Sequence, residues 1–172
     1  MNFLLVGINA SYSHTCLAVR SICEYVKKWQ KCNCKSDVSG SDAIDFIEFT
    51  INQPEREILR GIFEKKPDYV LFSTYIWNAE YTEKLIPAVK KILPDVIVGA
   101  GGPEFGFAPE LYFSKLTDLD FIVCGEGEEV IREIVKHGRI DRLDGICEKL
   151  IENEKHTGLH RVLYAEQLIC DM

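Results

Sequence analysis

Glycine, hydroxyl and aromatic residues gather in two short stretches of the sequence. One is GAGGPEFG, residues 99–106, which has four glycines among eight residues. The other is STYIWN, residues 73–78, in which a serine and a threonine precede a tyrosine and a tryptophan. A glycine lacks a Cβ and lets a large flat ligand approach the backbone, while aromatic side chains cover the apolar faces of such a ligand. These residue types favour cofactor binding over catalysis by side chains.

Tight turns offer a second interpretation of the glycines, because glycine adopts the positive φ angles that several turn types require. A further stretch, GEGEE at residues 125–129, again places glycines ahead of an expected helix. The sequence therefore leaves turn formation and ligand approach equally open. The carboxylates near these helix starts, Glu104, Glu126 and Glu128, suit the helix dipole. We predict no catalytic acid, base or nucleophile in the chain.

Most of the common cofactor and phosphate motifs of α/β proteins are missing. The expected first loop, NASYSHTC at residues 9–16, has no glycine, so it lacks the Gly-x-Gly-x-x-Gly pattern of dinucleotide sites. No Gly-Lys-Ser or Gly-Lys-Thr occurs, which excludes a P-loop. No acidic cluster follows the first expected strand, so a phospho-accepting aspartate is not predicted. A flavin phosphate site in the hydroxyl-rich first loop stays open.

Alternating apolar runs and amphipathic segments supply the elements that must position these loops. Apolar runs predict strands, and spacing near 3.6 residues with proline or glycine at the ends predicts helices. The expected strands are residues 2–9, 44–49, 68–75, 95–101 and 119–125. The expected helices are residues 17–29, 54–67, 79–93, 108–116 and 128–138, with residues 30–43 as a polar loop.

The strands are almost continuously apolar, as a parallel sheet with helices on both faces requires. We therefore predict an α/β fold: a flavodoxin-like, doubly wound, five-stranded parallel sheet of the Rossmann-like type. Residues 141–172 show no further strand–helix unit and predict a C-terminal β-hairpin extension that turns near residues 153–158. In such a sheet the loops after the strands meet at the carboxyl edge, where ligands bind.

Charge and length narrow the class of partner. The chain has 172 residues and a formal net charge of −7, which argues against a surface that neutralises nucleic acid or anionic lipid. The apolar opening, residues 1–10, has no basic residue ahead of it and is too short to span a bilayer. We expect one cytoplasmic domain with neither nucleic acid nor membrane as partner.

The seven cysteines are an odd number at irregular spacings, which predicts neither a disulfide framework nor a zinc site. Cys32 and Cys34 form a single Cys-x-Cys without a partner pair. We interpret most of the cysteines as buried or idle thiols.

Four segments together resemble a known family, the N-terminal cobalamin-binding domain of cobalamin-dependent radical SAM enzymes. They are GINASYSHTCLAVR, FSTYIWN, GAGGPEF and DFIVCGEGEE, and the resemblance covers residues 1–140. It implies a corrinoid cofactor whose corrin ring lies over the strand ends and whose nucleotide tail enters a groove between them.

Carried onto this sequence, the resemblance implies that Ser73 and Thr74 line the tail groove. Gly101 and Gly102 would let the tail pass the fourth strand, and GEGE at residues 125–128 would border the corrin side chains. The residues predicted to contact the cofactor are Tyr12, His14, Ser73, Thr74, Tyr75, Trp77, Gly101, Gly102, Pro103, Glu104, Gly125, Glu126 and Gly127.

His14 lies where cobalamin domains of the methionine synthase and mutase kind carry a cobalt-binding histidine, in Asp-x-His-x-x-Gly. The matching window here has Tyr12 in place of the aspartate and Leu17 in place of the glycine. A ligating imidazole needs an acceptor that fixes its other nitrogen, and the carboxylate that usually does so is missing. We predict no metal ligand in the chain and keep His14 as a cofactor contact.

Radical SAM enzymes hold an iron–sulfur cluster on Cys-x-x-x-Cys-x-x-Cys, and this spacing does not occur in the sequence. The resemblance therefore implies a cofactor module, with S-adenosylmethionine and the cluster held by a downstream radical SAM domain in cis. Residues 141–172 would then lead toward that domain. Two alternatives stay open: a stand-alone flavin-binding, nucleotide-binding or protein-interaction domain, and half of a glycosyltransferase-like protein that holds a nucleotide sugar.

Overall fold

The fold is a mostly parallel sheet with helices on both faces. The computed structural model describes residues 1–33, 43–140 and 143–148. Its strands are β1 (Asn2–Asn9), β2 (Ala43–Thr50), β3 (Tyr69–Ser73), β4 (Ile97–Gly101), β5 (Phe121–Val123) and β6 (Ile146–Glu148). Its helices are α1 (Leu17–Asn33), α2 (Glu55–Lys65), α3 (Ala79–Ile92), α4 (Pro103–Phe107), α5 (Pro109–Lys115) and α6 (Gly127–His137). Within this part of the chain, no helix combines the length and hydrophobicity needed to cross a bilayer.

The strand order β2-β1-β3-β4-β5-β6 confirms the predicted flavodoxin-like arrangement. The first five strands pair in parallel. The sixth, β6, runs antiparallel to β5 and extends the sheet by one strand that was not predicted as part of it. The predicted hairpin turn at residues 153–158 lies outside the described residues.

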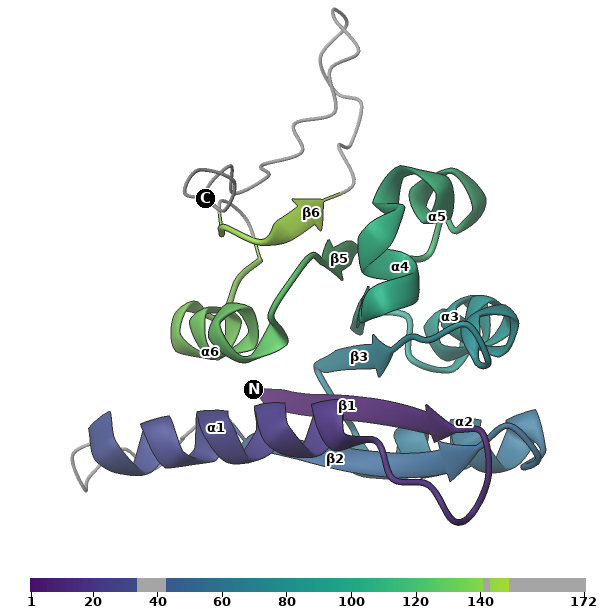
Figure 1. Ribbon diagram of the computed structural model, residues 1–172, viewed down its shortest axis with the longest axis horizontal. Helices are drawn as coiled ribbons and strands as arrows, with labels where there is room; N and C mark the ends of the chain where they lie inside the picture. Colours follow the sequence, from purple (N-terminus) through teal and green to yellow (C-terminus); the bar gives the residue numbers. More distant parts are fainter. Residues whose placement is uncertain (34–42, 141–142, 149–172) are drawn as a thin grey trace, which may run out of the picture.

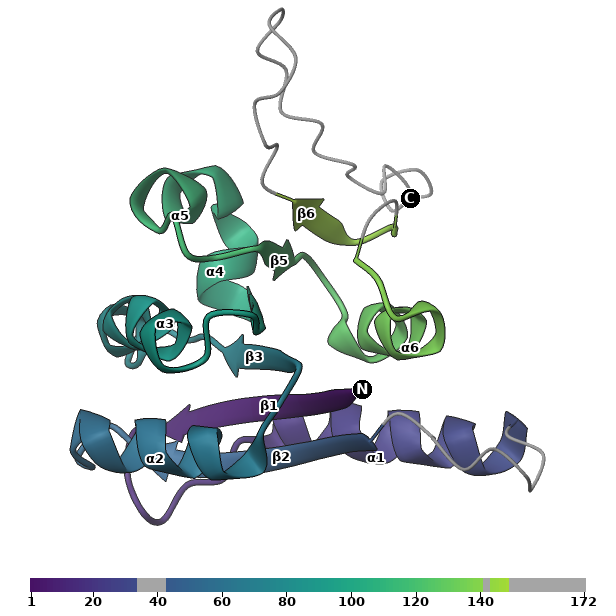
Figure 2. The ribbon, with the colours of Figure 1, turned by 180° about the vertical axis from the view of Figure 1, so that it is seen from behind.

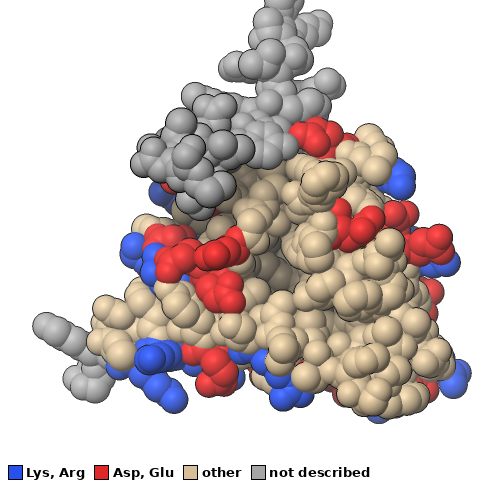
Figure 3. Space-filling view, in the orientation of Figure 1, with Lys and Arg blue, Asp and Glu red and all other residues tan. Residues whose placement is uncertain are grey.

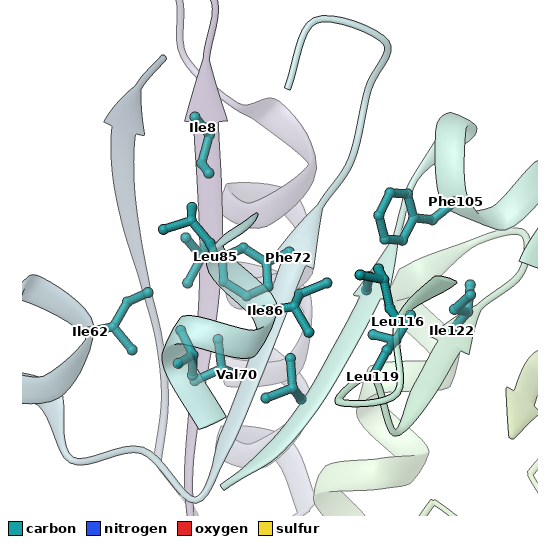
Figure 4. Packing of buried hydrophobic residues seen from close by; sticks show 14 of the residues in the cluster. Ile8, Ile62, Val70, Phe72, Leu85, Ile86, Phe105, Leu116, Leu119 and Ile122 are labelled. Atoms are coloured by element: carbon teal, nitrogen blue, oxygen red, sulfur yellow. The ribbon is translucent and has the colours of Figure 1, made fainter. Parts of the chain in front are cut away.

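Two apolar cores, one on each face of the sheet, explain why the strands are so uniformly apolar. Successive side chains of β1 alternate, so that Leu4 and Val6 join the core beneath α2, α3 and α5, while Phe3 and Leu5 join the core beneath α1 and α6. Figures 1 and 2 show α1 and α6 on one face and α2 to α5 on the other. Figure 4 shows how residues from α2, α3, α4, the segment after α5 and the strands fill the first of these cores.

Two helix boundaries differ from the prediction. Residues 30–33, expected in a loop, continue α1, and residues 103–107, expected in a loop after β4, form the short helix α4. Pro103 begins α4, where its fixed φ and missing N–H fit the first helical turn. The predicted stop of α6 at Gly138 is confirmed, since Gly138 adopts the left-handed conformation with φ 63°.

Two isoleucines of α3 test how far the core under this helix stabilises the fold. Ile86 is fully buried, whereas Ile92 is 36% exposed. Ile86→Ala should lower the free energy of unfolding by about 2–5 kcal/mol, because it removes buried methyl groups and leaves a cavity. Ile92→Ala should cost less than about 1.5 kcal/mol, since much of its side chain already contacts water. Urea unfolding of both variants measures the difference, and equal losses would contradict the packing described.

Candidate cofactor-binding site

A cavity of about 240 Å³ opens at the carboxyl edge of the sheet, between α1, α6 and the ends of β3, β4 and β5. It is hollowed into the face that carries α1 and α6, and Figure 3 shows acidic side chains beside a hollow on that face. We call it the tail groove, after the groove that the sequence analysis expects at this edge. Its lining residues are Leu5, Ala18, Val19, Ile22, Leu71, Phe72, Ser73, Tyr75, Ala100, Gly101, Gly102, Pro103, Val123, Gly125, Glu126, Gly127, Glu128 and Ile131.

The walls of the tail groove are apolar and its mouth is polar. Val19 of α1, Leu71 of β3 and Ile131 of α6 are buried in the core that lies below the groove. The polar residues of the lining are Ser73 at the end of β3, Tyr75, and the carboxylates Glu126 and Glu128 at the start of α6. This arrangement suits a flat, apolar group that enters from the mouth and leaves polar substituents outside.

The turn after β4 needs a glycine at residue 102. Gly102 has φ 101°, and a Cβ there would lie 2.5 Å from the backbone oxygen of Thr74. No side chain fits in that space, because this oxygen belongs to the backbone of the neighbouring loop and cannot move aside. The turn interpretation of this glycine is therefore correct, and the same turn also brings Gly101 and Gly102 to the lining of the tail groove.

Thr74 holds this turn from the end of β3 and is completely buried. Its backbone N–H and its hydroxyl both donate to the Gly101 carbonyl at 2.7 Å, and its Oγ1 accepts from the Phe105 N–H at 3.2 Å. Thr74 is not among the residues that line the tail groove. The structure thus places Ser73, but not Thr74, at the groove.

An aromatic pair follows β3 at the rim of the groove. The rings of Tyr75 and Trp77 stack at 4.4 Å with an interplanar angle of 6°. The indole N–H of Trp77 donates to the Ile8 carbonyl at 3.3 Å, and the Trp77 side chain remains 47% exposed. Tyr75 lines the tail groove and, with Trp77, a neighbouring pocket. A flat aromatic surface thus lies beside the groove.

Asn78 positions this loop and was not predicted. It is buried, and its side-chain amide donates to the carbonyls of Ile8 at 2.9 Å and Ser73 at 3.0 Å. Its Oδ1 accepts from the Tyr75 N–H at 2.8 Å. An asparagine directly before α3 is a common signal for the start of a helix, and this signal could have drawn attention to it.

Tyr12 and His14 lie apart from the tail groove. Tyr12 is 78% exposed and lines a polar pocket near the end of β2. His14 is exposed, its Nδ1 lies 3.0 Å from the Ser11 hydroxyl, and it borders the pocket shared with Tyr75 and Trp77. The structure therefore groups His14 with the aromatic pair but not with the groove.

Glu48, at the end of β2, organises the loop that carries His14 and was not predicted. Its carboxylate accepts from the Cys16 N–H and the Asn9 amide at 2.8 Å, from the Thr15 hydroxyl at 3.1 Å and from Arg20 Nε at 2.6 Å. Burial by itself would raise the pKa of the Glu48 carboxyl, but these donors outweigh it and hold the pKa below its usual value. The β1–α1 loop is thus fixed by one carboxylate from the neighbouring strand.

Of the remaining predicted residues, four line the tail groove and one, Glu104, lies outside it. Pro103, Gly125, Glu126 and Gly127 line the tail groove. Glu104 does not line it, and its carboxylate accepts a hydrogen bond from the Tyr112 hydroxyl at 2.8 Å. Burial, together with this carboxylate, raises the pKa of Tyr112 to about 12.

The sequence of this chain matches a known protein family. Residues 5–135 match the family described as B12 binding domain. The cobalamin-dependent radical SAM methyltransferase TokK of Streptomyces tokunonensis is 38% identical over 94 residues, which are 54% of this chain and 14% of TokK. The 2-(S-pantetheinyl)-carbapenam-3-carboxylate methyltransferase of Streptantibioticus cattleyicolor is 34% identical over 89 residues, 52% of this chain and 13% of that enzyme.

A solved structure shares the fold. The radical enzyme OxsB, cobalamin-dependent and solved with aqua-cobalamin and S-adenosylmethionine bound, superimposes with a TM-score of 0.68 at 18% identity. The match covers 84% of this chain and 20% of OxsB. The chain thus spans about one fifth or less of the length of these proteins.

Two buried threonines give a matched test of the Thr74 contact. Thr74→Val should lower the free energy of unfolding by about 1–3 kcal/mol, because the buried Phe105 N–H loses its acceptor. Thr82, also fully buried, has no hydrogen-bond partner for its hydroxyl within the described residues. Thr82→Val should leave stability unchanged or raise it by about 1 kcal/mol, since it removes an unsatisfied hydroxyl. Chemical unfolding of both isosteric variants measures this difference. Equal losses in the free energy of unfolding would contradict the role given to Thr74.

Glu48 predicts a defined pH dependence of stability. Its pKa is lower in the folded chain than the value of about 4.3 expected when unfolded, so it stabilises the fold above that pH and loses this contribution as pH falls through the folded pKa. Glu48→Gln should cost about 1–3 kcal/mol near neutral pH, and the difference from wild type should shrink as the pH falls below about 5.

Urea unfolding across this pH range measures the effect of Glu48→Gln. Glu64→Gln is the control, because Glu64 is 59% exposed and pairs with Arg60 on the surface, where such pairs contribute about 0–1 kcal/mol. A Glu48→Gln loss that stayed constant down to the lowest pH would show that the charge of Glu48 is not what stabilises the loop.

Proposed function

This chain belongs to the B12-binding domain family, and from that membership we propose that it is the cobalamin-binding module of a longer radical SAM enzyme that transfers methyl groups. Both relatives named above are methyltransferases, and one is described as cobalamin-dependent and radical SAM. Because the chain covers only a small part of each of them, the methyl-transfer activity and the downstream radical SAM domain in cis belong to the proposal.

The observation that carries the proposal is the fit between the tail groove and the nucleotide tail of cobalamin. The tail ends in a flat, largely apolar base, and the groove has apolar walls with glycines at residues 101, 102, 125 and 127. A Cβ at Gly101 would lie 3.2 Å from Cβ of Val123, which indicates how closely the end of β4 lies against β5. We assign the groove to the base and Ser73, at the end of β3, to a hydrogen bond with the tail.

The corrin ring would lie over the carboxyl edge, against the stacked pair Tyr75 and Trp77. The exposed aromatic surface of this pair is held in place by the Trp77 hydrogen bond to the Ile8 carbonyl. Glu126 and Glu128 stand at the mouth of the groove, where carboxylate oxygens accept hydrogen bonds from the amide side chains of a corrin. These two contacts would orient the ring relative to the tail.

His14 is a neighbour of the ring in this proposal and not a cobalt ligand. Its Nδ1 contacts the hydroxyl of Ser11 on the same loop, and no carboxylate occupies position 12 to fix the imidazole. The proposed module therefore binds cobalamin through its groove and aromatic surface, not through a metal bond from the loop after β1.

The chain would supply binding and orientation rather than reacting side chains. When bound, the corrinoid supplies a cobalt centre that accepts and releases a methyl group. The cysteine motif for an iron–sulfur cluster does not occur in this sequence, so radical generation from S-adenosylmethionine would depend on the downstream domain. Restricting water and fixing one face of the ring are the tasks that remain for these residues.

Hydroxocobalamin binding by the purified chain tests the proposal. Wild type should retain cobalamin through desalting, and cobinamide, which lacks the nucleotide tail, should bind about tenfold more weakly or worse. Ala18→Phe places a ring in the mouth of the groove, because Ala18 lines it and is only partly buried. It should reduce cobalamin affinity to the level of cobinamide. His14→Ala should keep the absorption spectrum of the wild-type complex.

Ala43→Phe is the matched control, since Ala43 is exposed at the start of β2, at the opposite edge of the sheet. It should bind cobalamin as wild type does. Equal cobalamin binding by Ala18→Phe and Ala43→Phe would overturn the assignment of the groove, and loss of cobalamin from a folded wild-type chain would overturn the proposed module itself.

A further inference from the structure

Two cysteines lie side by side at the β5–β6 edge of the sheet. Cys124 directly follows β5, Cys147 is in the middle of β6, and their Sγ atoms are 3.0 Å apart. The Cys124 N–H also donates to the Gly145 carbonyl at 2.8 Å, which holds the end of β5 against the start of β6. A disulfide needs a sulfur separation of about 2.05 Å, so the two sulfurs would have to approach by about 1 Å.

The rest of the described chain offers no comparable pair. Cys16 and Cys23 are buried under α1, and Cys32 is exposed near the end of that helix. Within the described residues, neither a disulfide nor a hydrogen bond joins any of these three thiols to another cysteine. Cys124 and Cys147 are therefore the candidates for disulfide formation, because the fold brings their sulfurs together although they are 23 residues apart in the sequence.

We propose that Cys124 and Cys147 form a redox-modification site that closes to a disulfide under peroxide. Cys124 is half-buried and Cys147 is buried, so a small oxidant reaches Cys124 first and Cys147 resolves the product. The inference rests on the geometry of these two thiols and is independent of the proposed cobalamin function.

The chemistry is a two-electron oxidation in two steps. The sulfur of Cys124 attacks hydrogen peroxide, an S–O bond forms as the O–O bond breaks, and one water leaves. The sulfur of Cys147 then attacks Cys124, the S–S bond forms as the S–O bond breaks, and a second water leaves. Two thiols and one peroxide thus give one disulfide and two waters.

The first step is slow at neutral pH. Burial, together with the contact to Cys147, raises the pKa of Cys124 to about 12, so its sulfur is protonated and poorly nucleophilic. The second step is favoured because the partner sulfur is already in contact. A sulfenic acid on Cys124 is therefore consumed before a second peroxide reaches it.

The disulfide would close a loop of the chain that contains one wall of the tail groove. The segment between the two cysteines contains all of α6, and five of its residues line the groove: Gly125, Glu126, Gly127, Glu128 and Ile131. Closing the bond covalently joins both ends of this wall at the sheet edge. Oxidation would thus fix β6 to the element that borders the groove.

Peptide mapping of the full chain after treatment with hydrogen peroxide tests the proposal. Free thiols are alkylated and the chain is digested with trypsin, which releases residues 116–132 with Cys124 and residues 143–149 with Cys147. The expected product is these two peptides joined by a disulfide, at least about tenfold more abundant than any other cysteine pair.

Three variants and an unfolded sample sharpen the result. Cys147→Ser and Cys124→Ser should abolish the cross-link, whereas Cys32→Ser should leave it unchanged. Oxidation in concentrated urea should distribute disulfides over several of the seven cysteines, because the folded contact is lost. Recovery of Cys124 as a free thiol, as a sulfinic acid or joined to a different cysteine, from folded wild type after complete oxidation of Cys32, would overturn the proposal.

Discussion

The site depends on the contact between the ends of β3 and β4, where Thr74 binds the turn at Gly101 and Gly102. Two donors from Thr74 meet one carbonyl, and Gly102 adopts a φ of 101° that lets the Thr74 backbone approach its Cα. This contact fixes the turn that leads into α4. It also holds Gly101 and Gly102 at the position where they line the groove. The apolar walls and the aromatic rim are arranged around it.

The loops on either side of this contact are held by side chains from neighbouring elements rather than by their own residues. Asn78 binds the carbonyls of Ile8 and Ser73, and Glu48 receives four donors from the β1–α1 region. Each of these polar groups is buried or partly buried, and each is satisfied, as stable packing requires. The edge is therefore preorganised for a ligand.

This arrangement fits a module that binds a cofactor while another domain carries the reaction. In the proposed module, an acidic chain with an apolar groove would bind the cofactor by shape and apolar contact and would leave its reacting face to a downstream domain. The family membership of residues 5–135 and the small share of each relative that the chain covers fit such a module. The antiparallel strand β6 is the last strand in the order of this sheet, and there Cys147 lies against Cys124.

Much of the fold was determined by sequence patterns that act over short distances. Continuous apolar runs, proline at helix starts and glycine at the end of α6 fixed the order of strands and helices, because burial on two faces and backbone conformation are local demands. The glycine and aromatic stretches indicated the carboxyl edge and, through a family resemblance, the cofactor. Ser73, Tyr75, Gly101, Gly102, Pro103, Gly125, Glu126 and Gly127 were accordingly predicted as site residues and do line the groove.

The tertiary structure alone decided which side chains reach the groove and which support it. Thr74 is adjacent to Ser73 yet points into the protein, Glu104 is held by Tyr112, and His14 lies outside the groove. Glu48 and the pair Cys124 and Cys147 act through partners 23 to 39 residues away. Such contacts are set by how strands pair and how loops meet in space, and no local spacing in the sequence encodes them.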